Sequence, residues 1–208
     1  MVQEIMKKIH WLGHDGFRID AEKVIYFDPY QIKTTVPADI IFVTHEHFDH
    51  CSIEDIQKIQ KSDTLIVTDS ASAKNLKGVV RVVKPGDKLN INSIEVEVVV
   101  SYNINKDFHR KVSGMLGFII TVDGVRIYHA GDTDFIPEMK TIKADIALLP
   151  VSGTYVMTAE EAVEAALTIN PAVAVPMHFG SIVGSESDAK RFAEKLSGKV
   201  EVTILGKE

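Results

Sequence analysis

The chain has 208 residues, of which 45% are hydrophobic and 25% are charged, an ordinary globular composition. Its net charge of −6 argues against a broad nucleic-acid-binding face, which would require a basic excess. Cys51 is the only cysteine, which excludes an intrachain disulfide. The N-terminus shows no signal-peptide pattern, and no apolar run is long enough for a membrane helix, so we expect a cytoplasmic protein.

Short apolar and β-branched runs, bounded by turn signals, predict a β-rich chain with a few helices. The predicted strands cover residues 9–12, 16–19, 24–27, 39–43, 64–68, 79–83, 88–91, 94–100, 115–122, 125–129, 145–150, 173–176 and 200–205. The predicted helices cover residues 53–61, 69–75, 158–170 and 188–196. Ser52 and Thr158 are the expected N-caps of the first and third of these helices.

One internal repeat indicates how the chain is organised. Ala38-Asp39-Ile40 opens one predicted strand, and Ala144-Asp145-Ile146 opens another, each of which leads into a His- or Gly-bearing loop. The repeat suggests two related β/α halves packed face to face. Because no linker or low-complexity tract separates them, we expect a single domain over residues 1–208.

The segment from Thr44 to His50 carries three histidines and two acids within seven residues, between an apolar strand and a helix. Loops at strand ends are where α/β folds place their ligands, and imidazole and carboxylate groups bind zinc and similar ions. If the loop starts extended, His45 and His47 point to the same side. Asp49 and His50 then turn toward a neighbouring position, so the loop supplies ligands to two metal ions.

Two sites need more ligands than one loop can offer. Asp132 and His178 also follow predicted strands, and Gly131 would let the backbone approach closely enough for Asp132 to bridge two ions. His109 lies in the loop before another strand. A turn or surface role is the alternative for each of these residues taken singly, but their shared position at strand ends favours a common site for Asp132 and His178.

The pattern Thr-His-x-His-x-Asp-His, with a later Gly-Asp and a later His, resembles the metallo-β-lactamase superfamily along essentially the whole chain. The resemblance implies an α/β fold, a four-layer αβ/βα sandwich in which two mixed β-sheets are flanked by helices. It implies that His45, His47 and His109 hold one metal, that Asp49, His50 and His178 hold the other, and that Asp132 bridges. It gives Asp28 a supporting role behind the metal loop.

Some assignments stay open at this point. The residues around His109 lack the glycine-rich stretch that the family often has there, and His10, His14 and His129 are its competitors. The metal ions are two divalent cations, with zinc expected from the ligand types and manganese or iron as alternatives. The sequence is compatible with a homo-oligomer.

The expected chemistry is hydrolysis by a hydroxide that bridges the two metals, with Asp49 orienting it and His14 as a candidate proton donor to the leaving group. Cys51 beside His50 is more typical of a small buried residue than of a nucleophile. Tyr155 and Met157 are expected to overhang the site. A small basic cluster, formed by Lys106, Arg110 and Lys111, could attract an anionic substrate, although solvated surface charge is the alternative.

Within the superfamily, the Trp11-Leu12-Gly13-His14 opening resembles the L-ascorbate-6-phosphate lactonase-like branch. This resemblance implies cleavage of a lactone, ester or phosphodiester bond in a small molecule. A di-iron oxidoreductase on the same fold is an alternative, but the oxygen-reducing members carry an acid at the position of His47. A metal-binding protein without turnover is a further alternative, which missing ligands would have indicated.

Overall fold

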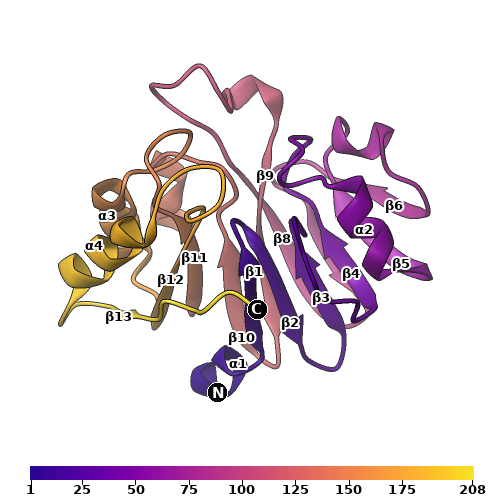
Figure 1. Cartoon of the computed structure of the whole chain (residues 1–208), viewed down its shortest axis with the longest axis horizontal. Coiled ribbons are helices and arrows are strands. Elements are labelled where there is room, and N and C mark those ends of the chain that lie inside the picture. The colour runs from indigo at the N-terminus through magenta and orange to yellow at the C-terminus, as the bar shows by residue number, and fades with distance from the viewer.

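The computed structural model describes residues 1–208, whose thirteen strands form two mixed β-sheets (Figure 1). The first sheet has the order β1-β2-β3-β4-β5-β6. Its strands are β1 (Ile9–Gly13), β2 (Gly16–Asp20), β3 (Val24–Phe27), β4 (Ala38–Phe42), β5 (Gln60–Thr68) and β6 (Val79–Val82). The second sheet has the order β13-β12-β11-β10-β9-β8-β7. Its strands are β7 (Lys88–Ile91), β8 (Ile94–Val100), β9 (Leu116–Val122), β10 (Val125–His129), β11 (Ile146–Pro150), β12 (Val173–Met177) and β13 (Glu201–Val202).

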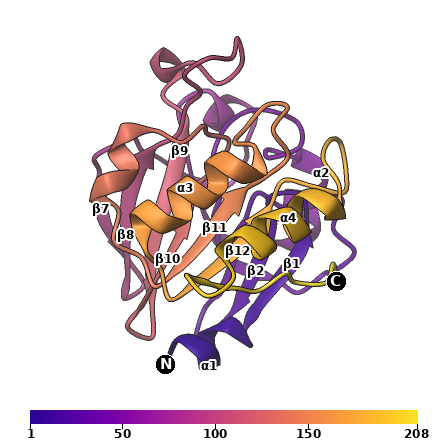
Figure 2. The ribbon, with the colours of Figure 1, turned by 90° about the vertical axis from the view of Figure 1, so that its left-hand side faces the viewer.

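Helices cover the outer faces of both sheets. Helix α2 (Ile53–Ile59) lies beside the first sheet, whereas α3 (Ala159–Ile169) and α4 (Glu186–Leu196) cover the second, as Figure 2 shows from the side. The short helix α1 (Val2–Met6) precedes β1. The predicted four-layer αβ/βα sandwich is therefore confirmed.

Apolar side chains from both sheets fill the space between them. Phe42 of the first sheet and Phe118 of the second are fully buried, with ring centroids 4.9 Å apart. A smaller cluster joins the outer face of the first sheet to α2 through Ile41, Ile56 and Ile66. Burial of large apolar side chains is the main favourable term in folding, so these two cores hold the four layers together.

The internal repeat has a structural counterpart in each sheet. The Asp39 carboxylate accepts a hydrogen bond from the backbone N–H of Val24 at 2.8 Å, and the Asp145 carboxylate accepts one from Arg126, also at 2.8 Å. Each acid thus ties the start of a strand to a neighbouring strand with which it pairs in parallel, β3 with β4 and β10 with β11. This matched geometry fits the expectation of two related halves.

Three predicted elements are cut short in the structure for reasons that the contacts show. The first helix ends at Ile59, because Gln60 pairs with Ala38 and begins β5. The helix predicted over 69–75 is a single 3-10 turn at Ser72–Lys74, where the Asp69 carboxylate accepts hydrogen bonds from the next backbone N–H groups. The strand predicted over 200–205 is limited to β13, because the chain then crosses to pair Lys207 with Trp11.

The sequence analysis did not predict three elements, namely α1 and the 3-10 helices at Lys111–Ser113 and Pro137–Thr141. The predicted caps are present, since the Ser52 hydroxyl accepts from the N–H of Asp55 and Thr158 forms a capping box with Glu161. These caps fix where α2 and α3 begin, and so where the preceding loops end.

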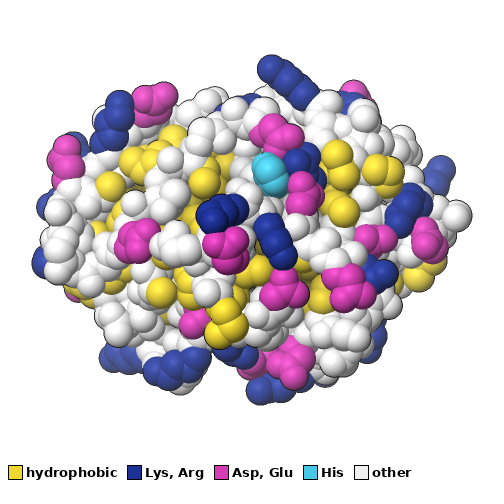
Figure 3. Space-filling view, turned by 90° about the horizontal axis from the view of Figure 1, so that it is seen from below, with side chains coloured by type: hydrophobic (Ala, Val, Ile, Leu, Met, Phe, Trp, Pro, Cys, Tyr) yellow, Lys and Arg dark blue, Asp and Glu magenta, His cyan; other side chains and the backbone are white.

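The surface carries both signs of charge. On the face seen from below, acidic and basic side chains are interspersed, and no continuous basic patch is visible there (Figure 3). None of the helices has the length and apolar character needed to cross a bilayer.

Candidate metal centre

The metal-loop segment, residues 44–50, is held from below by a buried carboxylate. Asp28 follows β3 and accepts hydrogen bonds from the backbone N–H of Thr44 at 2.8 Å and from its hydroxyl at 2.6 Å. It also accepts from Nδ1 of His50 at 2.8 Å. Because Asp28 and Thr44 are fully buried, these bonds fix both ends of the loop. This is the supporting position that the family resemblance implied for Asp28.

Three imidazoles converge at the first candidate metal position. His47 Nδ1 lies 2.9 Å from Nε2 of His45 and 3.2 Å from Nε2 of His109. Ligands of a tetrahedral zinc ion, with Zn–N bonds of about 2.0–2.1 Å, are separated by roughly 3.3 Å. The structure thus brings together the three residues expected at one metal, although His109 lies 62 residues from His47 in sequence.

The hydrogen bonds behind two of these rings leave the Nε2 lone pairs free for a cation. Thr44 Oγ1 donates to Asp28, so it can only accept from Nδ1 of His45, 3.0 Å away. Nδ1 of His109 lies 3.1 Å from the carbonyl oxygen of Tyr155, which is also an acceptor. In the neutral rings both Nε2 atoms are then unprotonated, and outer acceptors of this kind are typical of metal-binding histidines.

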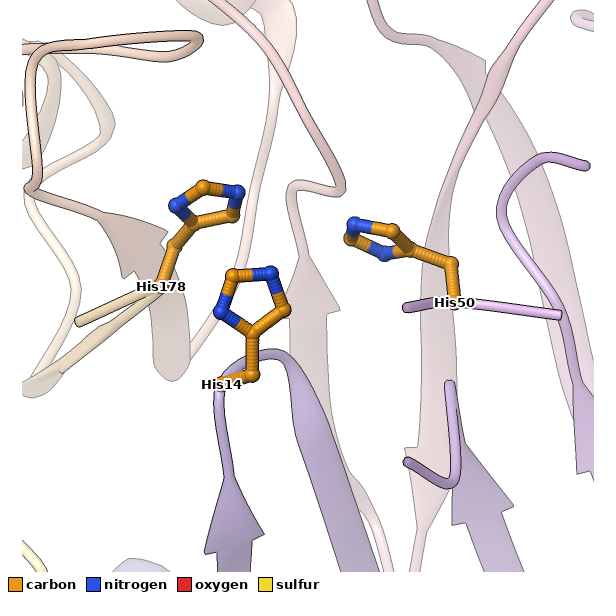
Figure 4. Close-up of side chains that lie close together, drawn as sticks. All are labelled: His14, His50 and His178. Atoms are coloured by element: carbon orange, nitrogen blue, oxygen red, sulfur yellow. The ribbon is translucent and has the colours of Figure 1, made fainter. Parts of the chain in front are cut away.

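A second group faces the first across Asp132. Nε2 of His50 is buried without a hydrogen-bond partner and lies 3.4 Å from Oδ1 of Asp132. Nε2 of His178 lies 3.4 Å from Oδ2 of Asp132, and its Nδ1 contacts the Ser152 hydroxyl at 2.8 Å. Figure 4 shows the rings of His14, His50 and His178 projecting from three separate loops into a common space.

Asp132 lies between the two groups, because its Oδ2 is also 3.3 Å from Nε2 of His109. Its position depends on Gly131, where φ is +62° and an added Cβ would lie 2.7 Å from the carbonyl oxygen of Leu116. The Ser101 hydroxyl donates to the Asp132 carbonyl at 2.7 Å. This placement fits the bridging role expected for Asp132 and the close approach expected at Gly131.

Asp49 and His14 lie together at the edge of the second group. Nε2 of His14 donates to Oδ2 of Asp49 at 3.1 Å, and the same oxygen is 3.8 Å from Nε2 of His50. Asp49 lines the cavity described below, whereas His14 is buried and reaches the cavity only through Asp49. Metal ligation by Asp49 and proton donation by His14 stay predictions.

Four of the nine non-glycine residues with positive φ belong to the site, namely His14 (+52°), Asp28 (+38°), His109 (+53°) and His178 (+59°). Such backbone conformations carry strain in L-residues and cluster where side chains must be aimed precisely at a ligand. The residues that directly follow β1 and β12 are also linked to each other, because the backbone N–H of His178 donates to the carbonyl of His14 at 3.1 Å.

A cavity of about 240 Å³ opens beside the histidines. Its polar floor is formed by His47, Asp49, His109 and Asp132. Its walls are formed by Phe48, Phe108, Tyr155 and Ile182. Phe108 and Tyr155 pack edge to face with ring centroids 4.9 Å apart. The site therefore combines a charged floor with apolar walls, as small-molecule sites usually do.

The two residues expected to overhang the site, Tyr155 and Met157, lie in different environments. Tyr155 lines the cavity, but Met157 is fully buried and does not, so the prediction was wrong for Met157. Its backbone N–H donates to the Thr133 carbonyl at 3.0 Å, which pulls it into the core. Phe48 and Phe108 were missed; exposed phenylalanines beside ligand histidines in polar loops were the available signal.

The basic cluster does not line the cavity. Lys106 is paired with Asp134, and Lys111 with Glu138 at 2.6 Å. Arg110 lies 3.6 Å from Asp107 on the surface. Solvated and paired surface charge, the alternative given for these residues, therefore describes them better than an anion-binding patch.

Of the three histidines that competed with His109, His14 lies beside His50 and His178 in the second group, and the other two lie away from both groups. His10 is half-exposed and pairs with Asp20 and Glu208. His129 uses both ring nitrogens, toward the Asp15 carbonyl at 2.9 Å and the Gly131 N–H at 3.3 Å. Cys51 is buried, and burial raises the pKa of its thiol to about 12. This supports the small buried role expected for Cys51, because the thiolate is the nucleophilic form.

The electrostatics of the two groups differ. Burial lowers the pKa of His45 and of His109, which keeps both imidazoles neutral and able to bind a cation. Burial, the largest single influence, also acts to lower the pKa of His50 and His178, but the neighbouring acids together outweigh it and raise the pKa of both: Asp132 with Asp28 at His50, and Asp132 with Asp15 at His178. The donor set fits two divalent cations, with protons competing mainly at the second group.

Comparison with known proteins agrees with this geometry. A profile described as the beta-lactamase superfamily domain matches residues 8–178. The chain belongs to the metallo-β-lactamase superfamily. It is 33% identical to a UPF0173 metal-dependent hydrolase of Thermoplasma acidophilum, over 95% of this chain and 94% of that protein. Relatives with this description show that the chain is a metal-dependent hydrolase.

Solved structures show the same fold. The crystal structure of a metal-dependent hydrolase from Parabacteroides distasonis superposes with a TM-score of 0.84 at 35% identity, covering 95% of this chain and 91% of that one. A zinc-dependent hydrolase of the metallo-β-lactamase superfamily from Thermotoga maritima superposes with a TM-score of 0.65 at 23% identity, over 95% and 97% of the two chains, and indicates the fold alone.

We predict that Gly131→Ala destabilises the protein by about 1–3 kcal/mol and lowers its metal content, because the new Cβ must displace either Asp132 or the Leu116 carbonyl. Urea unfolding of the metal-free protein measures the first effect. Gly124→Ala is the matched control, since Gly124 also has positive φ (+76°) but nothing within 4 Å of an added Cβ. Equal losses for the two variants would contradict the close-approach argument.

We also predict that metal binding near neutral pH releases about one or two protons, because His50 and His178 have raised pKa values and carry protons that the metal must displace. Calorimetric titration in two buffers of different ionisation enthalpy measures the release. As pH falls, protonation of these histidines should weaken binding further. Binding without proton release would show that the second group does not take up metal.

Proposed function

We propose that the chain is a binuclear metal-dependent hydrolase that cleaves a lactone, ester or phosphodiester bond in a small molecule. The observation that carries the proposal is the convergence of two imidazole groups on opposite sides of one carboxylate, Asp132. His45, His47 and His109 would hold one ion, and His50 and His178 would contribute to the other, with Asp132 shared. Zinc is proposed first, with manganese and iron as alternatives, and the proposed location is the cytoplasm.

Two bound divalent ions would supply Lewis acidity toward the substrate oxygen and make water acidic enough to attack at neutral pH. The protein's own residues orient the reacting groups and hold the proton that is transferred. Asp49 Oδ2, at the cavity wall, accepts a hydrogen bond from Nε2 of buried His14. This pair can hold a proton beside the scissile bond and pass it to the leaving group through Asp49. Asp49 is then the residue that contacts the substrate, and His14 acts through its hydrogen bond to Asp49.

The cavity walls support a substrate with an apolar acyl or aryl group next to the scissile bond. Phe48 and Phe108 expose 68% and 51% of their surface, although large apolar side chains are usually buried. Both of these residues lie on the cavity, beside His47 and His109 respectively. Because Lys106 and Lys111 are engaged by acids outside the cavity, a negatively charged substrate would depend on the metal ions alone.

The alternatives remain distinguishable. A di-iron oxidoreductase would contain iron and consume oxygen or a reductant, whereas the imidazole of His47 at the first group favours hydrolysis. A non-catalytic metal-binding protein would bind the ions without turnover. No contact in the site favours either of these over hydrolysis.

We predict that His47→Ala lowers kcat/KM at least about 100-fold and removes metal from the first position, while the fold survives. The assay compares a para-nitrophenyl acyl ester, an aryl-substituted lactone and bis(para-nitrophenyl) phosphate after metal reconstitution. His10→Ala is the control, because His10 pairs with Asp20 and Glu208 away from the cavity. Unchanged turnover in His47→Ala would refute the proposal, as would inactivity of the reconstituted wild type on every bond type.

For whichever substrate is cleaved, we predict that Phe108→Ala raises KM about tenfold, equivalent to about 1.4 kcal/mol of lost apolar contact. The effect should grow with the size of the acyl or aryl group and shrink for small substrates. Val112→Ala is the control, since Val112 lies in the same loop, is 92% exposed and does not line the cavity. A KM independent of Phe108 across a homologous ester series would contradict the apolar-substrate part of the proposal.

A further inference from the structure

Asp15 has a buried carboxyl group for which the protein offers no partner. Both carboxyl oxygens are buried and accept no hydrogen bond. The nearest ring nitrogen, Nδ1 of His50, is 3.8 Å from Oδ2 and already donates to Asp28. Burying a carboxyl group without a donor is costly, and burial raises the pKa of Asp15 well above its usual range. The sequence signalled only a turn at this position.

The backbone around Asp15 is nevertheless firmly held. The Asp15 carbonyl accepts a hydrogen bond from Nε2 of His129 at 2.9 Å. The preceding carbonyl, of His14, accepts from the indole N–H of Trp11 at 2.9 Å and from the backbone N–H of His178 at 3.1 Å. The turn between β1 and β2 is therefore fixed from both sides, and the carboxyl group is unpartnered for a reason other than a loose loop.

The Asp15 carboxyl group is aimed at the second metal group. Asp15, His50, Asp132 and His178 each present one potential ligand atom, and all four atoms lie within 4.8 Å of one another in the buried interior. Asp49, the carboxylate expected here from the sequence, is hydrogen-bonded to His14 and approaches from the cavity side, with its Oδ2 3.8 Å from Nε2 of His50. Two carboxylates, Asp15 and Asp49, thus approach the same position from different sides.

We propose that Asp15 is a carboxylate ligand of the second metal ion, an inference that rests on the binuclear site proposed above. The second position then has the imidazoles of His50 and His178 and the carboxylates of Asp15 and Asp132, besides Asp49, which the family resemblance implies. The first has three imidazoles and shares Asp132. Since carboxylates suit harder cations such as Mn²⁺ and imidazoles suit zinc, the two positions differ in metal preference, and the second retains Mn²⁺ better than the first.

This ligand also accounts for the charge of the buried group. Two divalent cations bring four positive charges into a space where Asp132, Asp28 and, at its edge, Asp49 supply carboxylates and the histidines are neutral when bound. A further carboxylate at Asp15 balances the cation that it contacts, and the cation offsets the cost of burying that carboxylate. In the metal-free protein the same group is destabilising, which gives a second, independent readout.

The test titrates metal-free protein with Zn²⁺ alone and with Mn²⁺ alone, using calorimetry for both ions and electron paramagnetic resonance for Mn²⁺. Asp15→Asn keeps the size of the side chain and removes its charge, and Asp49→Asn is the matched variant on the cavity side. We expect the wild type to bind two Zn²⁺ ions. Asp15→Asn should keep the first and bind the second about 10–100-fold more weakly, with Mn²⁺ binding lost. Asp49→Asn, which removes the carboxylate expected from the motif, should also keep the first Zn²⁺ ion and weaken the second.

Thermal unfolding gives the second readout. Metal-free Asp15→Asn should unfold at or above the temperature of the metal-free wild type, because it buries no unpartnered carboxyl group, and added Zn²⁺ should raise its Tm less. If Asp15→Asn does not fold, Asp15→Ser carries the same expectations with a smaller side chain.

The outcomes separate this inference from the function on which it rests. Two ions bound by Asp15→Asn with wild-type affinity would overturn the role of Asp15 and leave the binuclear site intact. Loss of the second ion in Asp49→Asn but not in Asp15→Asn would assign the position to Asp49 instead. A wild type that binds at most one ion after reconstitution would overturn the binuclear proposal and this inference together.

Discussion

The buried carboxylate of Asp28 is the interaction on which the site depends. It accepts hydrogen bonds from the backbone and hydroxyl of Thr44 at one end of the metal loop and from His50 at the other. Through the Thr44 hydroxyl it also sets the tautomer of His45. One acid, itself at a strand end and with positive φ, thereby decides which nitrogen of each ring faces the metal position.

The rest of the fold serves to bring other strand ends to this loop. Parallel strands β4, β11 and β12 end at one edge, and the loops after them carry the metal loop, Ser152 and His178. Within each half, an equivalent hydrogen bond, to Asp39 in the first sheet and to Asp145 in the second, ties two neighbouring strands together. A rigid sandwich with ligands on several loops gives a preorganised site, in which strained backbone positions aim the ligand side chains at a common point.

Most of the architecture could be predicted from the sequence, because strand patterns, N-caps and the histidine motif are local signals. Six of the seven expected ligand residues lie in the two candidate metal groups, including His109, whose surroundings depart from the family pattern, and Asp49 lies at the edge of the second group. What could not be predicted depends on three-dimensional packing. Gln60 pairs with Ala38 and does not continue the predicted helix, and Met157 is buried in the core, where its backbone N–H bonds to Thr133.

The roles of the carboxylates in the site also could not be predicted from the sequence alone. The sequence favoured Asp49 because it lies in the motif, and it gave Asp15 no weight because an aspartate between glycines is an ordinary turn residue. Only the fold shows that Asp49 is bonded to His14 at the cavity wall while Asp15 is buried without a donor. Likewise, the apolar walls come from residues far apart in sequence, such as Phe48, Phe108 and Tyr155.

The central claim is that two cations share Asp132, and anomalous X-ray diffraction from crystals reconstituted with Zn²⁺ tests it most directly. The account predicts two anomalous peaks about 3.5–4 Å apart. One should lie among the ring nitrogens of His45, His47 and His109, and the other beside His50 and His178, with the Asp132 carboxylate between the peaks. A single peak at full Zn²⁺ saturation, or two peaks not joined by Asp132, would contradict it.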